Sequence, residues 1–139
     1  LRLPLELRRE IYSYILPRTL PTRTASFRGH AWARGHTSLL GVNRQLSGEG
    51  LDLLYGANYF VLDVAYDGIR FRYRWVLPRQ RLAPNRAYAF PAHFSPANVA
   101  RMRNFIINVT LVDDYIGMTK YNCGGRGLIA GLRAQVQRL

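Results

Sequence analysis

The chain has 139 residues, of which 48% are hydrophobic, so we expect one folded domain over residues 1–139 and exclude a disordered chain. No apolar run approaches the roughly 20 residues of a membrane-spanning helix, and no secretory segment is recognisable, which predicts a soluble protein of the cytoplasm or nucleus without membrane contact. The 20 basic and 8 acidic residues give a net charge of +12, which attracts polyanions. Because the chain begins at Leu1 rather than Met, we expect it to be a piece of a longer protein.

The first predicted element is an amphipathic helix over Leu3–Leu16. Pro4 suits the first helical position, where a missing backbone N–H costs nothing. Leu7, Ile11 and Ile15 recur every four residues, so we expect these three side chains to form the face that packs on the core.

Residues 18–35 are rich in Arg and show no hydrophobic period, which predicts a long basic loop. A second helix is predicted over Ser38–Tyr55, because its apolar side chains are spaced as on one helical face. Asn43 falls beside this apolar stripe, so we expect it to be buried and hydrogen-bonded to a neighbouring segment. Arg44 is expected to pair with Glu49 across a helical turn.

A β-hairpin between residues 60 and 75 is the strongest local signal. Asp67-Gly68 lies between two runs of β-branched and aromatic residues and is a preferred two-residue hairpin loop. With this loop, the predicted pairs on the apolar face are Tyr66/Ile69, Val64/Phe71, Leu62/Tyr73 and Phe60/Trp75. On the opposite face Asp63 is expected to lie across from Arg72, so that face suits water or an anionic partner.

In the remaining chain the sequence predicts an irregular segment, a short helix, a strand and a C-terminal helix. Residues 78–91 contain three prolines and are expected to be irregular. Ser95, which precedes a proline, is a typical helix cap and predicts a short helix through about residue 103. Phe105–Val112 is a β-branched run typical of a strand covered on both sides, and residues 128–139 predict a C-terminal helix. The predicted fold class is α+β: two N-terminal helices, a β-hairpin, a helix–strand unit and a C-terminal helix around one small sheet.

Three stretches occur in a recognisable order. Residues 3–16 read LPLELRREIYSYIL, residues 39–64 read LLGVNRQLSGEGLDLLYGANYFVLDV, and residues 97–111 read ANVARMRNFIINVTL. Together they resemble the F-box-like domains of filamentous fungi, in which a Leu-Pro helix precedes a Val-Asn-Arg-Gln block that continues into Leu-Leu-Tyr-Gly-x-Asn-x-Phe.

The resemblance implies a non-catalytic protein–protein adaptor without a cofactor. In F-box proteins the Leu-Pro helix docks on the Skp adaptor of a cullin–RING ubiquitin ligase, and the remainder binds a target. Carried over to this chain, the resemblance implies that the partner-binding residues of this helix are Leu3, Pro4, Leu5, Arg8 and Tyr12. The chain departs from the family in an insertion, residues 18–37, between its first and second helices.

Side chains suited to catalysis are few and scattered. Cys123 is the only cysteine, and His30, His36 and His93 are the only histidines. No nucleophile–base motif surrounds them and their spacing does not match a zinc site, so we expect no catalytic residue, no bound metal and no enzyme activity.

Arginines in and after the hairpin support an alternative function. The predicted anion- or partner-binding patch consists of Arg70, Arg72, Arg74, Arg79 and Arg81. Such side chains bind phosphates and carboxylates bidentately, which would make the chain a nucleic-acid- or phosphate-binding module. No aromatic residue lies between the arginines on this strand face, so a base-stacking surface is absent and a protein partner is favoured over nucleic acid. The arginines are equally consistent with a solvated surface.

Overall fold

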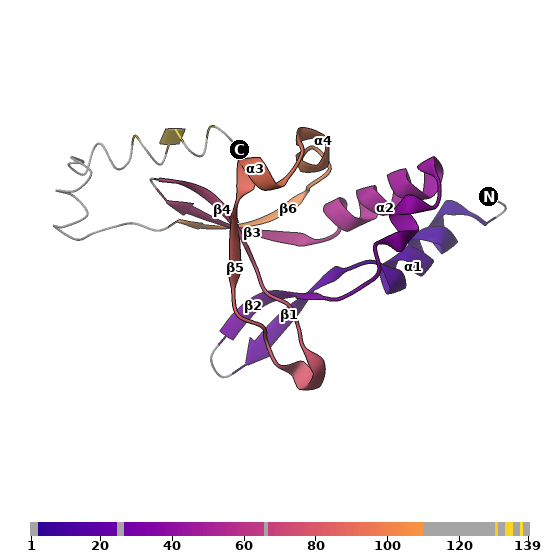
Figure 1. The fold of residues 1–139 in the computed structure, drawn as a ribbon, viewed down its shortest axis with the longest axis horizontal. Helices are drawn as coiled ribbons and strands as arrows, with labels where there is room; N and C mark the ends of the chain where they lie inside the picture. The colour runs from indigo at the N-terminus through magenta and orange to yellow at the C-terminus, as the bar shows by residue number, and fades with distance from the viewer. Residues whose placement is uncertain are drawn as a thin grey trace.

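The computed structural model describes residues 3–24, 27–65, 67–109, 130, 133–134 and 137. Within these residues the fold combines four α-helices with two small β-sheets (Figure 1). The predicted α+β class is confirmed, although two sheets replace the single sheet that we expected. The residues that carry the apolar face of the predicted C-terminal helix lie outside the described part of the chain.

Two helices lie side by side at one end of the molecule: α1 over Leu5–Ile15 and α2 over Arg44–Gly56 (Figure 1). The first helix is where the sequence predicted it, with Pro4 as the capping residue rather than the first helical residue. The second helix is shorter than predicted, because Ser38–Gly41 form a separate 3-10 turn, η1.

The helical conformation is interrupted between η1 and α2 at Asn43. The backbone there is extended, with φ −158° and ψ 169°, and Asn43 Oδ1 accepts a hydrogen bond from Leu46 N at 2.9 Å. Asn is a favoured helix cap, because its side chain satisfies a backbone N–H that has no partner within the helix. The prediction that Asn43 is buried within the helix is therefore wrong: the residue is exposed and starts the helix.

A β-hairpin occupies the segment predicted as a basic loop, with β1 over Arg18–Thr24 and β2 over Phe27–Ala33. The two strands are antiparallel along their whole length. The loop prediction is wrong because the packed residues of the hairpin give no hydrophobic period: Ala31 is completely buried but small, and Trp32, the next residue, packs against Phe60. Pro21 lies in β1, which among the described strands pairs with β2 alone and therefore tolerates a missing N–H.

Four strands form the larger sheet in the order β5-β4-β3-β6, with β3 and β6 parallel and the other neighbours antiparallel. Their bounds are Tyr59–Ala65 for β3, Gly68–Tyr73 for β4, Arg86–Ala89 for β5 and Asn104–Val109 for β6. Strand β5 corrects the prediction that residues 78–91 are irregular throughout, and a 3-10 turn, η2, covers Pro78–Gln80.

The β3–β4 hairpin is present, but its register differs from the prediction by two residues. Leu62 pairs with Phe71, and the last pair is Ala65 with Gly68. Gly68 therefore belongs to β4 instead of the loop, with a φ of 152° that a side chain would strain. Because side chains alternate with a period of two, a shift of two residues leaves both predicted faces intact.

The core lies on one face of the larger sheet. Phe60, Leu62 and Val64 of β3 are almost completely buried and pack with Ile69, Phe71, Phe90 and Met102. Two short helices cover this face, α3 over Phe90–His93 and α4 over Pro96–Val99 (Figure 1). The predicted burial of Phe60, Leu62 and Phe71 is confirmed, whereas Tyr73 and Trp75 are only half-buried.

The sequence predicted that residues 105–112 form a strand covered on both sides. For the described residues of β6, at the edge of this sheet, that prediction is wrong. Phe105, Ile107 and Val109 point to the core face yet remain 38%, 49% and 52% exposed. The predicted cap before α4 is confirmed, because Ser95 Oγ accepts a hydrogen bond from Asn98 N at 3.4 Å. This helix ends at Val99, earlier than predicted.

Candidate functional site

One face of α1 is attached to α2 through a carboxylate. Arg8 donates from Nε to Glu49 Oε2 at 2.9 Å and from Nη2 to Glu49 Oε1 at 2.6 Å. Tyr12, which is 3% exposed, donates its hydroxyl to Glu49 Oε2 at 2.9 Å, and Gln45 Nε2 donates to Oε1 at 3.0 Å. Glu49 therefore binds Arg8, and not Arg44 as predicted.

This network shifts the acidity of its members. Hydrogen bonds from Arg8 and Gln45 lower the pKa of Glu49 from 4.5 to about 2. Burial, followed by the hydrogen bond to Glu49, raises the pKa of Tyr12 above its ordinary value. Two of the residues predicted to bind a partner, Arg8 and Tyr12, are therefore engaged within the fold.

The opposite face of α1 is apolar and exposed. Leu7, Ile11 and Tyr14 of the helix, spaced by four and three residues, together with Leu3, which precedes the cap Pro4, form what we call the α1 stripe. Leu7 is 53% exposed, Ile11 45% and Tyr14 75%. The prediction that Leu7 and Ile11 face the core is wrong, because the polar network of Arg8 and Tyr12 occupies the inner face. Of the predicted partner-binding residues, Leu3 and Pro4 are exposed and Leu5 is half-buried.

Two acidic residues lie along one edge of the α1 stripe. Glu10 is three residues after Leu7 and four before Tyr14, which places it beside both on the helix surface. Glu6 occupies the corresponding position one turn earlier, and both carboxylates are exposed. The exposed apolar surface of α1 therefore has an acidic border, in contrast to the strongly basic chain as a whole.

Asn58 holds α1, α2 and the β1–β2 hairpin together. It is 5% exposed, and its Oδ1 accepts from Thr19 N at 2.6 Å and from Thr19 Oγ1 at 3.2 Å. Its Nδ2 donates to Leu54 O at 2.8 Å and to Pro17 O at 3.1 Å. All four hydrogen-bonding positions of the amide are used, so Asn58 fixes the end of α1 relative to α2.

The predicted arginine patch is only partly assembled. The prediction that Asp63 lies directly across from Arg72 is wrong, because Asp63 is opposite Arg70 in the ladder; the two side chains still form a diagonal ion pair, with Arg72 Nε 3.1 Å from Asp63 Oδ2. Arg70 pairs with Asp67 at 2.6 Å, near the hairpin turn. Arg79 and Arg81 are exposed in and after η2, outside the sheet.

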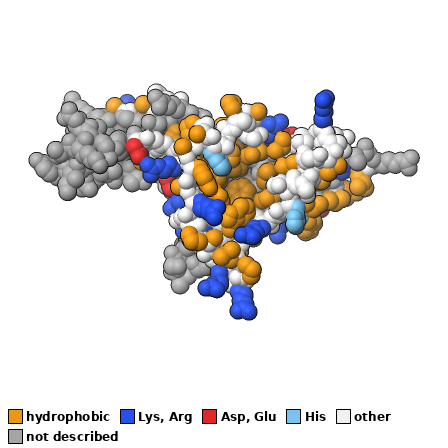
Figure 2. Space-filling view, in the orientation of Figure 1, with side chains coloured by type: hydrophobic (Ala, Val, Ile, Leu, Met, Phe, Trp, Pro, Cys, Tyr) orange, Lys and Arg blue, Asp and Glu red, His pale blue; other side chains and the backbone are white. Residues whose placement is uncertain are grey.

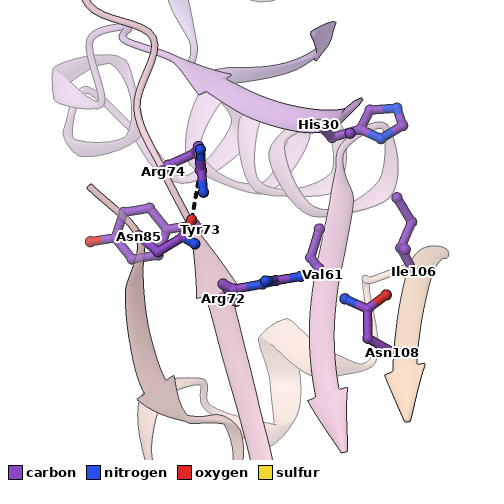
Figure 3. Close-up of a pocket in the computed structure, with 9 residues that line it drawn as sticks. His30, Val61, Arg72, Tyr73, Arg74, Asn85, Ile106 and Asn108 are labelled. Carbon is purple, nitrogen blue, oxygen red and sulfur yellow. Dashed lines mark hydrogen bonds between the residues drawn. The ribbon is translucent and has the colours of Figure 1, made fainter. Parts of the chain in front are cut away.

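A small pocket lies between β2 and the arginine face of the larger sheet (Figure 3). Its volume is about 100 Å³, and its lining residues are Gly29, His30, Val61, Arg72, Tyr73, Arg74, Asn85, Ile106 and Asn108. Arg74 Nε donates to Asn85 Oδ1 at 2.6 Å, the contact that is dashed in Figure 3. The structure therefore joins two patch arginines, Arg72 and Arg74, with polar residues that the sequence analysis had not selected.

An apolar groove is the second hollow of interest. It has a volume of about 340 Å³ and is lined mainly by the aromatic side chains of Trp32, Tyr55, Phe60, Phe71, Tyr73, Trp75 and Phe94. Figure 2 shows hydrophobic side chains gathered across the middle of one face of the molecule, with Lys and Arg side chains around them. The described residues that line this groove include no Asp or Glu, so the groove has no negative charge to attract a cation.

No protein-family model, curated protein or solved structure matches the chain, so the resemblance to fungal F-box-like domains stays a prediction. Among the described residues, no group of three or more His, Cys, Asp or Glu side chains is placed to hold a metal ion. In the same part of the chain, no helix is long and apolar enough to cross a membrane.

Proposed function

We propose that the chain is a non-catalytic interaction module that binds a partner protein through the α1 stripe. The observation that carries the proposal is the exposure of Leu7, Ile11 and Tyr14 on one side of a helix whose other side is fixed. A row of large apolar side chains open to water is costly for a monomer and typical of a surface that a partner covers.

The attachment of α1 to α2 favours binding because the helix is already ordered and loses little conformational entropy when a partner binds. Arg8 and Tyr12 both bind Glu49 of α2, and Arg8 Nη1 also donates to Leu3 O. A helix held in this way presents its outer face without a further ordering cost when a partner binds.

The chemistry of the stripe defines the partner surface. Apolar side chains at helical spacing fit a hydrophobic groove or a second helix, and Glu6 and Glu10 favour basic residues at its border. The resemblance of residues 3–16 to the Leu-Pro helix of F-box proteins points to a Skp-type adaptor as the partner, and thereby to a role in recruiting targets to a ubiquitin ligase.

Isothermal titration of a purified fungal Skp-type adaptor into the chain tests the proposal. We expect saturable one-to-one binding that weakens at least about tenfold in the double variant Leu7→Ser/Ile11→Ser, because central apolar anchors carry most of the binding energy. The matched control is Ile107→Ser/Val109→Ser, which removes two similarly exposed apolar side chains from β6. Absence of binding, or equal weakening by both double variants, would refute the proposal.

A further inference from the structure

We propose that the apolar groove binds a proline-rich peptide segment that carries an acidic residue beside its prolines. This inference goes beyond the interaction assigned to α1, since it concerns a different surface of the molecule and a partner of different chemistry. It rests on three observations: the aromatic lining of the groove, the angles between its rings and a basic residue at its border.

Pairing between distant segments builds this groove. Trp32 N donates to Arg74 O at 2.9 Å and Val76 N donates to Trp32 O at 2.8 Å, so β2 lies beside the chain that continues from β4. The pairing brings Trp32 and Trp75 to one groove, with their ring centroids 6.5 Å apart. Both indoles are half-buried, so part of each remains available to a ligand.

The angles between the rings favour a compact group that is not planar. The ring planes of Trp32 and Trp75 make an angle of 64°, and those of Tyr73 and Trp75 make an angle of 86°. Two parallel rings would hold a planar base, because the base then stacks on both of them. Rings at steep angles to one another instead enclose a puckered ring, and the pyrrolidine ring of proline is the puckered ring that aromatic-lined grooves bind.

The composition of the lining favours a proline-rich segment over a helix. Among the described residues that line the groove, only Pro17 and Leu54 are aliphatic, and most of the others are aromatic. Proline-rich segments dock in aromatic-lined grooves, and their preformed extended conformation loses little entropy on binding. An amphipathic helix instead needs apolar space along a row of anchors that are spaced by three and four residues.

The polar groups of the lining match the backbone of such a segment. The indole groups can only donate hydrogen bonds, and the hydroxyl groups of Thr37, Tyr55 and Tyr73 can also donate. The described lining residues include no side-chain carboxylate or amide. Proline offers a carbonyl acceptor but no N–H. A proline-rich segment therefore presents acceptors to a groove of donors and brings few donors that would need a partner.

The border of the groove carries a positive charge. Arg86 lies opposite Tyr73 in the β4–β5 ladder, so both side chains are on one face of the sheet, and Arg86 is exposed. A hydrogen bond with Tyr73 raises the pKa of Arg86 above its ordinary value. None of the four ion pairs among the described residues includes Arg86, so no carboxylate there balances its charge. Aromatic rings attract cations, but this charge opposes a cationic ligand and favours an acidic residue next to the prolines.

The intrinsic fluorescence of the unaltered protein tests the site. Trp32 and Trp75 are the only tryptophans of the chain, and both line the groove, so their emission reports on its occupancy. Titration with a synthetic peptide of consecutive prolines flanked by aspartates is expected to shift the emission to shorter wavelength in one saturable process, because the peptide removes water from the indoles. A control peptide with alanines in place of the prolines has the same charge and is expected to cause no shift.

Calorimetric titration of variants with the proline peptide locates the contacts. Trp75→Leu is expected to weaken binding at least about tenfold, because aromatic anchors carry most of the binding energy. The matched control is Tyr59→Leu, which removes an aromatic side chain that is 42% exposed on the opposite face of the same sheet and should change the affinity less than about twofold. Arg86→Gln should weaken the peptide with aspartates at least about twofold and leave an uncharged proline peptide unaffected.

Three results would overturn the proposal. The first is an emission that the proline peptide leaves unchanged, or that the alanine peptide shifts equally. The second is equal weakening by Trp75→Leu and Tyr59→Leu. The third is tighter binding of a single-stranded oligonucleotide than of the proline peptide, with quenching of the tryptophan emission, because that result would assign the groove to base stacking.

Discussion

In most surface helices the apolar face is buried and the polar face is exposed, whereas in α1 the inner face is polar and the outer face is apolar. Its inner face carries an arginine and a tyrosine that share one carboxylate of α2, and its outer face carries the apolar α1 stripe. An apolar stripe usually marks the side of a helix that packs on the core. Here Arg8 and Tyr12 take that side, because Glu49 satisfies both of them where they are shielded from water.

The comparison shows that hydrophobic periodicity locates a helix and its stripe but does not decide which side is buried. A polar network can hold a helix when every member has a partner, and the apolar side is then left for another molecule.

The largest loss of stability is expected at Gly35, where the segment after β2 packs against the backbone at the end of α1. A Cβ atom added at Gly35 would lie 2.4 Å from Leu16 C and 2.5 Å from Ile15 O. These are backbone atoms and cannot move aside, so Gly35→Ala is expected to cost at least about 3 kcal/mol in the free energy of unfolding. Urea denaturation measures this loss. Gly41→Ala is the control, since a Cβ atom there meets nothing within 4 Å.

Removal of the shared carboxylate is expected to have the next largest effect. Glu49→Ala leaves Arg8 and Tyr12 without their acceptor in a shielded position, so the midpoint of thermal unfolding should fall by several degrees. Glu6→Ala removes an exposed carboxylate from the same helix pair and should leave the midpoint unchanged. If the two variants melt alike, the inner face does not depend on Glu49.

The pH dependence of stability should carry the signature of the same carboxylate. The pKa of Glu49 is about 2 in the folded chain, against an ordinary value of 4.5. A lowered pKa means that the stabilisation is complete above pH 4.5 and is lost as the pH falls toward 2. The difference in unfolding midpoint between the native chain and Glu49→Gln should therefore shrink between about pH 7 and about pH 2.5. A difference that grows on acidification would contradict this assignment.

The smallest effect is expected on the outer face. Leu7→Ser and Ile11→Ser remove apolar groups that are about half exposed, so each should change the free energy of unfolding by less than about 1 kcal/mol. Phe60→Ala, in the core, should cost about 3–5 kcal/mol in the same assay. A loss at Leu7 or Ile11 close to that of Phe60 would show that the α1 stripe is buried.

Local patterns predicted the parts of the fold that local residues determine. The alternation along β3 and β4 identified the buried face correctly, and a register error of two residues did not disturb it. The β1–β2 hairpin was missed because Ala31, a fully buried residue of β2, is too small to give a hydrophobic signal. The prediction that Asn43 is buried within a helix failed because the apolar period continues across it. An asparagine at such a position can cap a new helix, as Asn43 does for α2.

The candidate sites depended still more on distant pairings. The ion pair of Asp63 with Arg72 lay within reach of sequence reasoning because both side chains are on the polar face of one hairpin, although they are diagonal neighbours rather than opposite each other. The contribution of His30 to the pocket was not, since it follows from the bridge between Trp32 and Trp75, residues far apart in the sequence. The partners of Glu49 were missed for the same reason, because Arg8 precedes it by 41 residues.

The most direct test of the central claim is the chemical accessibility of single cysteines on α1, with Cys123 replaced by Ser. Leu7→Cys and Ile11→Cys should react with a thiol reagent much faster than Leu16→Cys, whose native side chain is 4% exposed at the inner end of the helix. Addition of the Skp-type adaptor should slow the reaction at positions 7 and 11 and leave a cysteine at exposed Ile107 unaffected. Equal reaction rates at positions 7, 11 and 16, or no protection by the adaptor, would contradict the claim that α1 turns its apolar stripe outward to bind a partner.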